Sequence, residues 1–316
     1  GAAGNDVFRG HRLPADLVNQ YFYGEPVGRI VRQVYSEKNE GITSIQNQYL
    51  NKEAEFIQST DPLFRPTDMA TAPDGTMYIV DMYRGIIQEG NWTQEGSYLR
   101  TKILQYQMDD VIENGRIWRV TYEGMPRDKN KPKMFEESAT ELVKHLEHPN
   151  GWWRDKAQQL LILRQDLAVT DDLVKMATNS TNELARIHAL WTLEGLGSLD
   201  KALVLQLLKD QSANIRIQAL RASETLYKYG EKSLEDAYRQ LSLDKDPSVV
   251  IQALLSAYIL NIPEIEKLIN TTAEANPARG VALVTTQLLE KIAAAITNID
   301  AEQLKPAAHS LKSISG

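Results

Sequence analysis

Hydrophobic and polar positions divide the chain into two differently patterned parts. Up to about residue 122, apolar residues fall in short runs rich in Val, Ile, Tyr and Thr, with Gly, Pro and Asp between them. Such runs are typical of short β-strands joined by turns. From Phe135 onward, apolar residues recur with a helical period over long stretches. The pattern therefore predicts a β-rich first part followed by an all-helical second part.

The clearest hairpin signal lies between residues 68 and 80. Asp74-Gly75, which follows Pro73, supplies the positive φ that a tight turn needs, and it separates the runs 68–72 and 76–80. In the second run, Thr76-Met-Tyr-Ile-Val, apolar and polar residues do not alternate. We therefore expect a hairpin whose second strand is covered on both faces.

Three more strands and one helix are predicted around this hairpin. The runs 20–25 and 28–35 are separated by a Pro-Gly turn segment, and 53–58 adds an outer strand. The stretch 82–114 is a long insertion whose centre has apolar residues at helical spacing, at Leu99, Ile103 and Met108. Insertions of this length are usually functional or interface-forming, and a decorative segment packed under the helical part is the alternative.

The helical part is repetitive. Four segments of similar form end in Ala157, Ala189, Ala219 and Ala253, which are 32, 30 and 34 residues apart, and a turn such as Lys245-Asp246-Pro247 precedes each segment. A near-constant period of this kind is the signature of HEAT-like helical repeats. The last stretch, 262–316, loses the period, which predicts a capping pair of helices. The polar, Pro- and Lys-rich segment 124–134 is predicted to be the linker between the two parts.

A family resemblance follows from the motifs around the hairpin. Arg65-Pro-Thr-Asp, a short apolar run, Pro73-Asp-Gly and a strand ending at Asp81 are closed later by 115–120, Gly-Arg-Ile-Trp-Arg-Val. This order resembles the final blade of the β-propeller in soluble quinoprotein sugar dehydrogenases. With Met82-Tyr-Arg-Gly added, the chain is similar to large bacterial extracytoplasmic proteins in which a dehydrogenase-like propeller precedes HEAT-like repeats and often a c-type cytochrome domain.

The resemblance implies a mixed all-β plus all-α architecture. Residues 1–123 would be the last two blades of a β-propeller, with the insertion at about 82–114, and 135–316 a HEAT-like α-α solenoid with a C-terminal cap. Two blades cannot close a propeller, because each blade must bury both faces against neighbours. We therefore expect the missing N-terminal blades on the same, longer protein, of which this chain would be a fragment; a separate chain carrying them is the alternative.

The resemblance also implies an activity. The intact protein would be a periplasmic or extracellular oxidoreductase of sugars or other alcohols, using pyrroloquinoline quinone (PQQ) with Ca²⁺ and passing electrons to a haem domain outside this chain. The alternative is a cofactor-free propeller and solenoid that act as a protein- or carbohydrate-binding scaffold. The catalytic histidine of that family lies in an earlier blade, so the catalytic residues remain unknown.

The family's quinone-binding residues are only partly present. Its Lys corresponds to Pro26 or Val27 here, and its Arg-x-Arg reads Arg65-Pro66-Thr67, so one Arg of the pair remains. Arg65 can bind an anion bidentately, and Asp81 and Arg84 stand at the end of a strand and the start of the insertion. These three residues form the predicted ligand site. The alternative is structural: Arg and Asp at strand ends commonly tie blades together through backbone carbonyls.

Composition and the other polar residues narrow these possibilities. The formal charge of −7 and the absence of a basic run argue against nucleic acid as a partner, and no stretch has the apolar length of a membrane span. Zero Cys excludes thiolate metal sites and a CxxCH haem attachment.

No metal site is predicted, because His145 and His148 are better interpreted as a helix end. Trp152-Trp153 are predicted to fasten the first repeat to the blades. A cationic group is also present and is predicted to be solvated surface; it consists of Arg9, His11, Arg12 and Arg29.

Overall fold

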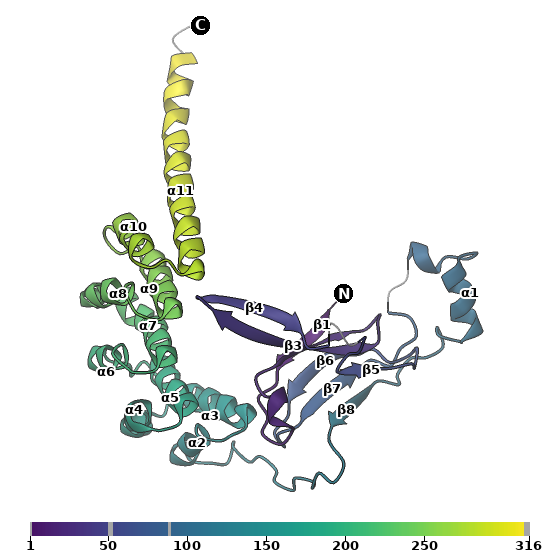
Figure 1. Ribbon diagram of the computed structural model, residues 1–316. Coiled ribbons are helices and arrows are strands. Elements are labelled where there is room, and N and C mark those ends of the chain that lie inside the picture. Colours follow the sequence, from purple (N-terminus) through teal and green to yellow (C-terminus); the bar gives the residue numbers. More distant parts are fainter. Residues whose placement is uncertain (1, 50–52, 88–89, 313–316) are drawn as a thin grey trace. The chain divides into compact units, whose positions relative to one another are not determined.

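The computed structural model describes residues 2–49, 53–87 and 90–312, with the backbone alone from residue 296 onward (Figure 1). Its internal contacts divide the chain into two compact units. The first unit consists of Gly1–Glu37 and Thr43–Arg164, and the second of Lys38–Ile42 and Gln165–Gly316. Strands occupy the N-terminal part and helices the C-terminal part, so the predicted mixture of β and α structure is confirmed.

The first unit contains two sheets. Sheet A has the strand order β1-β2-β3-β4, with β5 paired to β3, and sheet B has the order β6-β7-β8. The registers described for β1–β2, β2–β3, β3–β5, β6–β7 and β7–β8 are all antiparallel. The strands are β1 (Ala3–Val7), β2 (Tyr21–Glu25), β3 (Ile30–Asn39), β4 (Ile42–Asn47), β5 (Ile57–Gln58), β6 (Pro66–Thr71), β7 (Met77–Asp81) and β8 (Arg116–Val120).

The predicted hairpin is confirmed. β6 and β7 pair with Thr71 opposite Met77, and Gly75 adopts a φ of 77° in the turn between them. The strands expected at 20–25 and 28–35 are β2 and β3, whereas the outer strand expected at 53–58 shrinks to the two residues of β5. Sequence reasoning missed β1 and β4. β4 carries polar residues at most positions, so it gives no hydrophobic pattern to detect.

The two sheets bury one common core. Phe22 and Val31 from sheet A pack in one cluster with Met69, Met77 and Ile79 from sheet B. The opposite face of sheet B is open within the described residues: Val80 is 38% exposed, and Ile117, its partner on β8, is 66% exposed. The expectation that both faces of β7 are covered is therefore met on the face that packs on sheet A, whereas Val80 and Ile117 stay exposed on the other.

Three helices complete the first unit. The helix predicted in the insertion is confirmed as α1 (Tyr98–Gln105); Ile103 is buried, while Leu99 remains exposed. Two helices follow the predicted linker, α2 (Ala139–His145) and α3 (Gly151–Arg164). Short 3₁₀ turns lie in both units, at η1 (Ala15–Leu17), η2 (Asn91–Thr93), η3 (Leu167–Val169) and η4 (Lys232–Leu234). The placement of 124–134 as the domain linker stays a prediction.

The second unit is a series of helix pairs. Contacts join α4 to α5, α6 to α7, α8 to α9 and α10 to α11, and α5, α7, α9 and α11 contact each other in sequence. The helices are α4 (Thr170–Asn179), α5 (Glu183–Gly195), α6 (Lys201–Leu207), α7 (Ala213–Lys228), α8 (Glu235–Leu241), α9 (Pro247–Ile259), α10 (Ile265–Ala275) and α11 (Arg279–Lys312). The last two form the pair expected after residue 262.

Small and charged residues hold successive pairs together. Ala189, Ala219 and Ala253 are fully buried, which lets the helix backbones approach closely. Arg216 donates to the Asp244 carboxylate at 2.8 Å and to the backbone carbonyl of Asp210 at 2.7 Å. Residues 38–42 belong to this unit, where the Gly280 amide donates to the Glu40 carbonyl at 2.8 Å. No helix in the described part of the chain is both long and apolar enough to cross a membrane.

Candidate functional site

Arg65 is a buried cation that directly precedes β6. Its side chain emerges into the protein interior, and the residue is only 8% exposed. Nη1 donates to the carbonyls of Pro26 at 3.1 Å and Phe64 at 3.3 Å, and Nη2 donates to the carbonyl of Gly85 at 3.0 Å. Nε has no hydrogen-bond partner in the described structure. The guanidinium is therefore held by main-chain oxygens and retains donor capacity.

No described carboxylate forms an ion pair with Arg65. Burial lowers the pKa of Arg65 from its ordinary value, and the neighbouring Arg29 lowers that pKa further. The carboxylates of Asp61, Asp81 and Glu25 act in the opposite direction at longer range. A buried guanidinium without a directly bonded counter-ion attracts an anion, because each added negative charge recovers part of the lost solvation.

An apolar cavity of about 270 Å³ lies beside Arg65. Its other lining residues come from the β2–β3 turn and from the insertion, including α1: Val27, Gly85, Ile86, Ile87, Thr93, Leu99, Ile103 and Met108. The insertion thus forms most of the wall of the cavity. A cavity of this size with one cation and mostly apolar walls suits part of a small amphipathic anion.

The structure brings two predicted cofactor positions together at this cavity. Pro26 and Val27 stand where the resemblance places the family's Lys, and Arg65 stands where it places the first Arg. Pro26 gives its carbonyl oxygen to Arg65, and Val27 lines the cavity with it. The sequence did not predict that residues 26–27 lie next to residue 65, because their proximity results from the packing of sheet A against sheet B.

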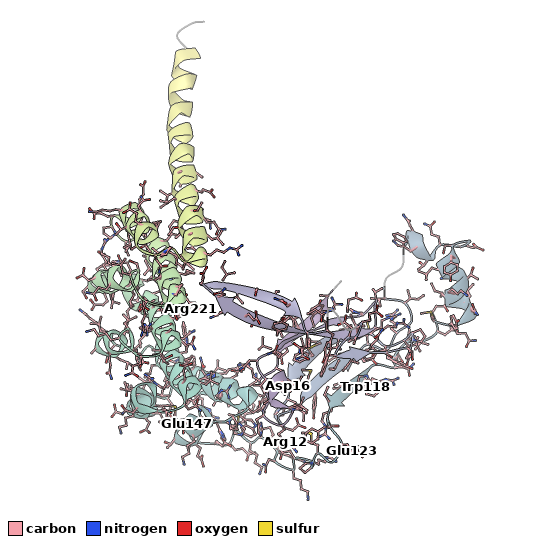
Figure 2. All side chains as sticks on the ribbon, viewed as in Figure 1. Arg12, Asp16, Trp118, Glu123, Glu147 and Arg221 are labelled. Carbon is pink, nitrogen blue, oxygen red and sulfur yellow. The ribbon has the colours of Figure 1, made fainter. Side chains whose placement is uncertain are left out.

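Asp81 accepts hydrogen bonds at the end of β7 from three separate segments. Its Oδ1 accepts from the backbone amides of Arg65 and Tyr83, each at 2.8 Å. Its Oδ2 accepts from Nε1 of Trp118, which projects from β8, at 3.0 Å (Figure 2). The carboxylate is fully buried. These bonds join segments within and beside sheet B and involve no backbone carbonyl, and the prediction that Asp81 binds a ligand stays a prediction.

Arg84 lies apart from this pair. Its side chain is exposed, and it makes no hydrogen bond or ion pair with any residue that the structure describes. The next residue, Gly85, lines the cavity and accepts from Arg65, but Arg84 itself is not part of the lining. The structure therefore brings Arg65 and Asp81 together and leaves Arg84 at the surface.

The residues of this chain do not by themselves fit PQQ. The quinone carries three carboxylates, and the cavity offers one cation, two of whose three nitrogens already serve backbone carbonyls. Across the ranges described, no group of three or more His, Asp or Glu side chains could hold a metal ion. Any such cofactor would need most of its ligands from elsewhere.

A second cluster of polar contacts joins the start of α3 to the β6–β7 turn and to Arg9, all within the first unit. Asn150 is fully buried, and its Nδ2 donates to the carbonyls of Ala72 at 2.9 Å and Pro73 at 3.2 Å. Its Oδ1 accepts from the amide of Trp152 at 3.0 Å, as a helix N-cap does. Nε1 of Trp153 donates to the Pro73 carbonyl at 2.9 Å. The predicted fastening role thus fits Trp153.

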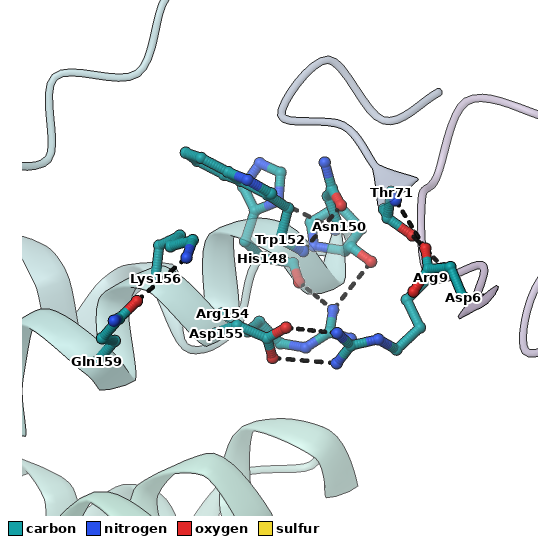
Figure 3. Close-up of polar contacts among 11 residues, drawn as sticks. Asp6, Arg9, Thr71, His148, Asn150, Trp152, Arg154, Asp155, Lys156 and Gln159 are labelled. Atoms are coloured by element: carbon teal, nitrogen blue, oxygen red, sulfur yellow. Dashed lines mark hydrogen bonds and ion pairs between the residues drawn. The ribbon is translucent and has the colours of Figure 1, made fainter. Parts of the chain in front are cut away.

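Arg9 extends this cluster toward β1. Its Nη1 donates to Oδ1 of Asp155 at 3.0 Å, and its Nη2 donates to Oδ2 of the same residue, which makes the pair bidentate (Figure 3). The Arg9 carbonyl accepts from the Gly151 amide at 2.8 Å. A Cβ built on Gly151 would lie 2.7 Å from Cβ of Arg9, so the glycine permits this close approach.

Arg9, His11, Arg12 and Arg29, the cationic group that was predicted to be solvated surface, each have separate contacts. Arg9 pairs with Asp155, Arg12 donates to the carbonyls of Asp74 and Pro126, and Arg29 donates to the carbonyl of Thr60. The ring of His11 lies edge-on to His148, with centroids 5.5 Å apart. Sequence reasoning missed this contact and also the role of Asn150, although an Asn before a helix is a cap signal.

His145 and His148 each have a hydrogen-bond partner of their own. Nε2 of His145 lies 2.8 Å from Oε2 of Glu137, and Nδ1 of His148 accepts from the Asn150 amide at 3.0 Å. Burial lowers the pKa of His148, and the nearby His11 and His145 lower it further. Burial also lowers the pKa of His11, with Arg12 as the second cause.

Comparison with known proteins gives one family match. Residues 1–124 match a family described as a domain of unknown function (DUF7133). No curated protein matches the chain. The matched stretch contains both sheets and the insertion, and it ends four residues after β8, which closes at Val120. The sheets and the Arg65 cavity therefore lie inside one family segment.

Proposed function

We propose that the chain is part of an extracytoplasmic oxidoreductase that resembles quinoprotein sugar or alcohol dehydrogenases. In this proposal, sheets A and B are the last two blades of a β-propeller. The helix pairs of the second unit form a HEAT-like solenoid that docks a partner or an electron-transfer domain, such as a c-type cytochrome. The protein would work in the periplasm or outside the cell, as the resemblance implies.

The observation that carries this proposal is the cavity beside Arg65. Two positions that the resemblance connects with cofactor binding, 26–27 and 65, meet there with Gly85 of the insertion around a buried cation that has no ion-pair partner in the described part of the chain. A dehydrogenase-like site would use this cation to hold one carboxylate of an anionic ligand. The remaining ligands would come from the missing blades.

The open face of sheet B supports the propeller interpretation. Val80 and Ile117 are apolar side chains on a face that no described segment covers, while the other face is packed on sheet A. In a propeller, each blade is packed on both sides by neighbouring blades. A further blade over Val80 and Ile117 would bury them.

A binding scaffold without a cofactor is the second candidate, and the contacts of Arg65 favour it. Two of its guanidinium nitrogens serve backbone carbonyls, and the Asp81 carboxylate is saturated by three donors. Both residues therefore have a sufficient structural role. The missing Lys and second Arg of the cofactor motif agree with a propeller that has lost its quinone.

The experiment that separates the two candidates uses the native gene product. Its intact mass is measured first, and its visible spectrum is then recorded before and after addition of PQQ, Ca²⁺ and a panel of aldoses. The oxidoreductase proposal expects a mass well above 35.6 kDa and a quinone spectrum that changes when sugar is added. Quinone binding should weaken at least tenfold in Arg65→Gln and be unchanged in Arg84→Gln.

One result would decide against the oxidoreductase, and another would decide against the Arg65 cavity as its cofactor site. A larger mass without quinone binding or reduction would leave the scaffold as the function. Quinone binding that is equally strong in Arg65→Gln, with a far-ultraviolet circular dichroism spectrum like that of the wild type, would show that the Arg65 cavity does not hold the cofactor.

A further inference from the structure

A groove runs along α3 in the first unit, away from Arg65. It encloses about 510 Å³ and is formed by one face of α3 and the segment that leads into α2. The residues that line it are Pro132, Met134, Phe135, Trp152, Lys156, Gln159, Leu160 and Leu163. This volume is in the range of small-molecule and peptide side-chain sites. We call it the α3 groove.

The wall of the α3 groove is held in place by Arg164. Its Nη2 donates to the carbonyls of Met134 and Phe135, both at 3.0 Å, and its Nη1 donates to the carbonyl of Glu137 at 2.6 Å. The Met134 side chain is buried beneath this wall. The groove is therefore formed before any ligand binds, which lowers the entropic cost of binding.

Two large apolar side chains stand exposed at the groove although their backbone is fixed. Phe135 is 87% exposed and Leu163 is 70% exposed. Trp152 shares the lining with them and is half-buried. Large apolar side chains gathered around one groove, with ordered backbone, are typical of a surface that binds a partner.

The groove has the length of a short peptide. Trp152, Lys156, Gln159 and Leu163 are spaced at i, i+4, i+7 and i+11, so they follow one face of α3 over about 16 Å. An extended peptide of about five residues covers the same distance at about 3.3 Å per residue.

The charge at the groove is positive. Lys156 is the one charged side chain among the lining residues, and its Nζ donates to Oε1 of Gln159 at 3.1 Å, with no carboxylate of the described chain paired to it (Figure 3). Lys131 and Lys133, both exposed, flank the lining residue Pro132. Of the nearby acids, Glu137 is engaged with His145, and Glu136 is exposed beside Phe135.

We propose that the α3 groove docks an acidic peptide segment of a partner protein. One aromatic or aliphatic side chain of the segment packs between Phe135, Trp152 and Leu163, and a neighbouring carboxylate pairs with Lys156. The proposal goes beyond the oxidoreductase assignment and does not depend on it, since peptide binding needs no quinone. We favour an acidic ligand over a neutral one because no carboxylate of the described chain pairs with Lys156, although acidic residues outnumber basic ones and the formal net charge is −7.

The test screens the whole 316-residue chain on an array of eight-residue synthetic peptides. The array combines Asp or Glu with one central Phe, Trp, Leu or Ala, and a matched set carries Lys in place of the acids. The strongest binders are then labelled with fluorescein and titrated by fluorescence anisotropy. We expect peptides with acids and a large central side chain to bind at least tenfold more tightly than their Ala or Lys counterparts.

Variants of the groove locate the binding. Leu163→Asp should weaken binding at least tenfold and Lys156→Glu about fivefold or more, and 0.5 M salt should weaken it in the wild type. The matched control is Tyr229→Ala, which removes an aromatic side chain with the same 87% exposure in the second unit and should change nothing. Circular dichroism confirms that each variant is folded.

Several outcomes would overturn the proposal. The first is that no peptide on the array binds the wild type more tightly than Leu163→Asp. The second is that Lys-containing peptides bind as tightly as acidic ones. The third is that the groove selectively binds oligosaccharides or anionic lipid vesicles. A concentration-dependent dimer that Leu163→Asp abolishes would assign the groove to a second copy of the chain instead.

Discussion

At the scale of single residues, three donors converge on the Asp81 carboxylate: the amides of Arg65 and Tyr83 and the indole of Trp118. They come from the start of β6, the start of the insertion and β8. A single fully buried side chain therefore closes a local turn at Tyr83 and joins the end of β7 to the start of β6 and to β8. This is the reason to regard Asp81 as a structural centre, whatever ligand the cavity beside Arg65 takes.

The first prediction concerns the stability that Asp81 provides. Asp81→Ala leaves three donors without an acceptor, and each loss of this kind costs about 1 to 3 kcal/mol, so we expect a destabilisation of at least about 3 kcal/mol. Urea unfolding monitored by tryptophan fluorescence measures it. The control is Asp68→Ala on β6, which removes an exposed carboxylate that bonds only its neighbour's amide. A loss for Asp81→Ala no larger than for Asp68→Ala would contradict the structural role.

The second prediction follows from the lowered pKa values of His11 and His148. A histidine whose pKa is lower in the folded state binds its proton more readily when the chain unfolds. Its contribution to stability is thus complete above the ordinary pKa of about 6.5 and is lost as the pH falls through the folded-state value. The titratable groups that act on the pKa of His11 are Arg12, Asp74 and Asp128, and those that act on the pKa of His148 are His11, His145 and Arg154.

The measurement compares urea unfolding of the wild type and His148→Gln at pH 8.0 and pH 5.5. We expect the wild type to lose more stability than the variant over this range, because the variant lacks one of the protons taken up on unfolding. An identical loss in both proteins would show that His148 does not titrate differently in the folded and unfolded states.

At the scale of elements, the sequence predicted what local patterns determine. The Asp74-Gly75 turn with the strands beside it and the helix around Ile103 depend on residues close in sequence, and both were found. β4 could not be predicted because its side chains do not alternate in polarity. The wall of the Arg65 cavity could not be predicted either, since Val27, Arg65 and the lining residues of the insertion come together only through tertiary packing.

The third prediction concerns the attachment of α3 through Asn150. Asn150→Ala removes a helix cap, worth about 1 kcal/mol, and also leaves the Ala72 and Pro73 carbonyls without their donor in a buried site. We expect about 2 to 4 kcal/mol of destabilisation and faster amide hydrogen exchange in the β6–β7 turn. The control Asp200→Ala removes only the cap of α6 and should cost about 1 kcal/mol. Equal costs would show that the carbonyl contacts contribute nothing.

At the scale of the whole molecule, each compact unit is assembled from both sides of the predicted linker. The first unit contains α2 and α3, which follow residues 124–134, and the second contains Lys38–Ile42, which precede them. Asn150, Trp153 and Arg9 connect α3 to the strands within the first unit. The Glu40 carbonyl accepts from Gly280 within the second. A boundary read from composition alone therefore need not separate two independent domains.

The last prediction tests this arrangement by cutting the linker. Replacing residues 127–133 with a specific protease site and cleaving it should leave two fragments that co-elute on gel filtration near the position of the intact chain. They should separate only in denaturant, because each unit loses buried hydrogen bonds when the fragments part. Adding Asn150→Ala and Arg9→Ala should lower the urea concentration at which they separate. Two separate peaks without denaturant would instead establish 124–134 as a linker between domains that fold independently.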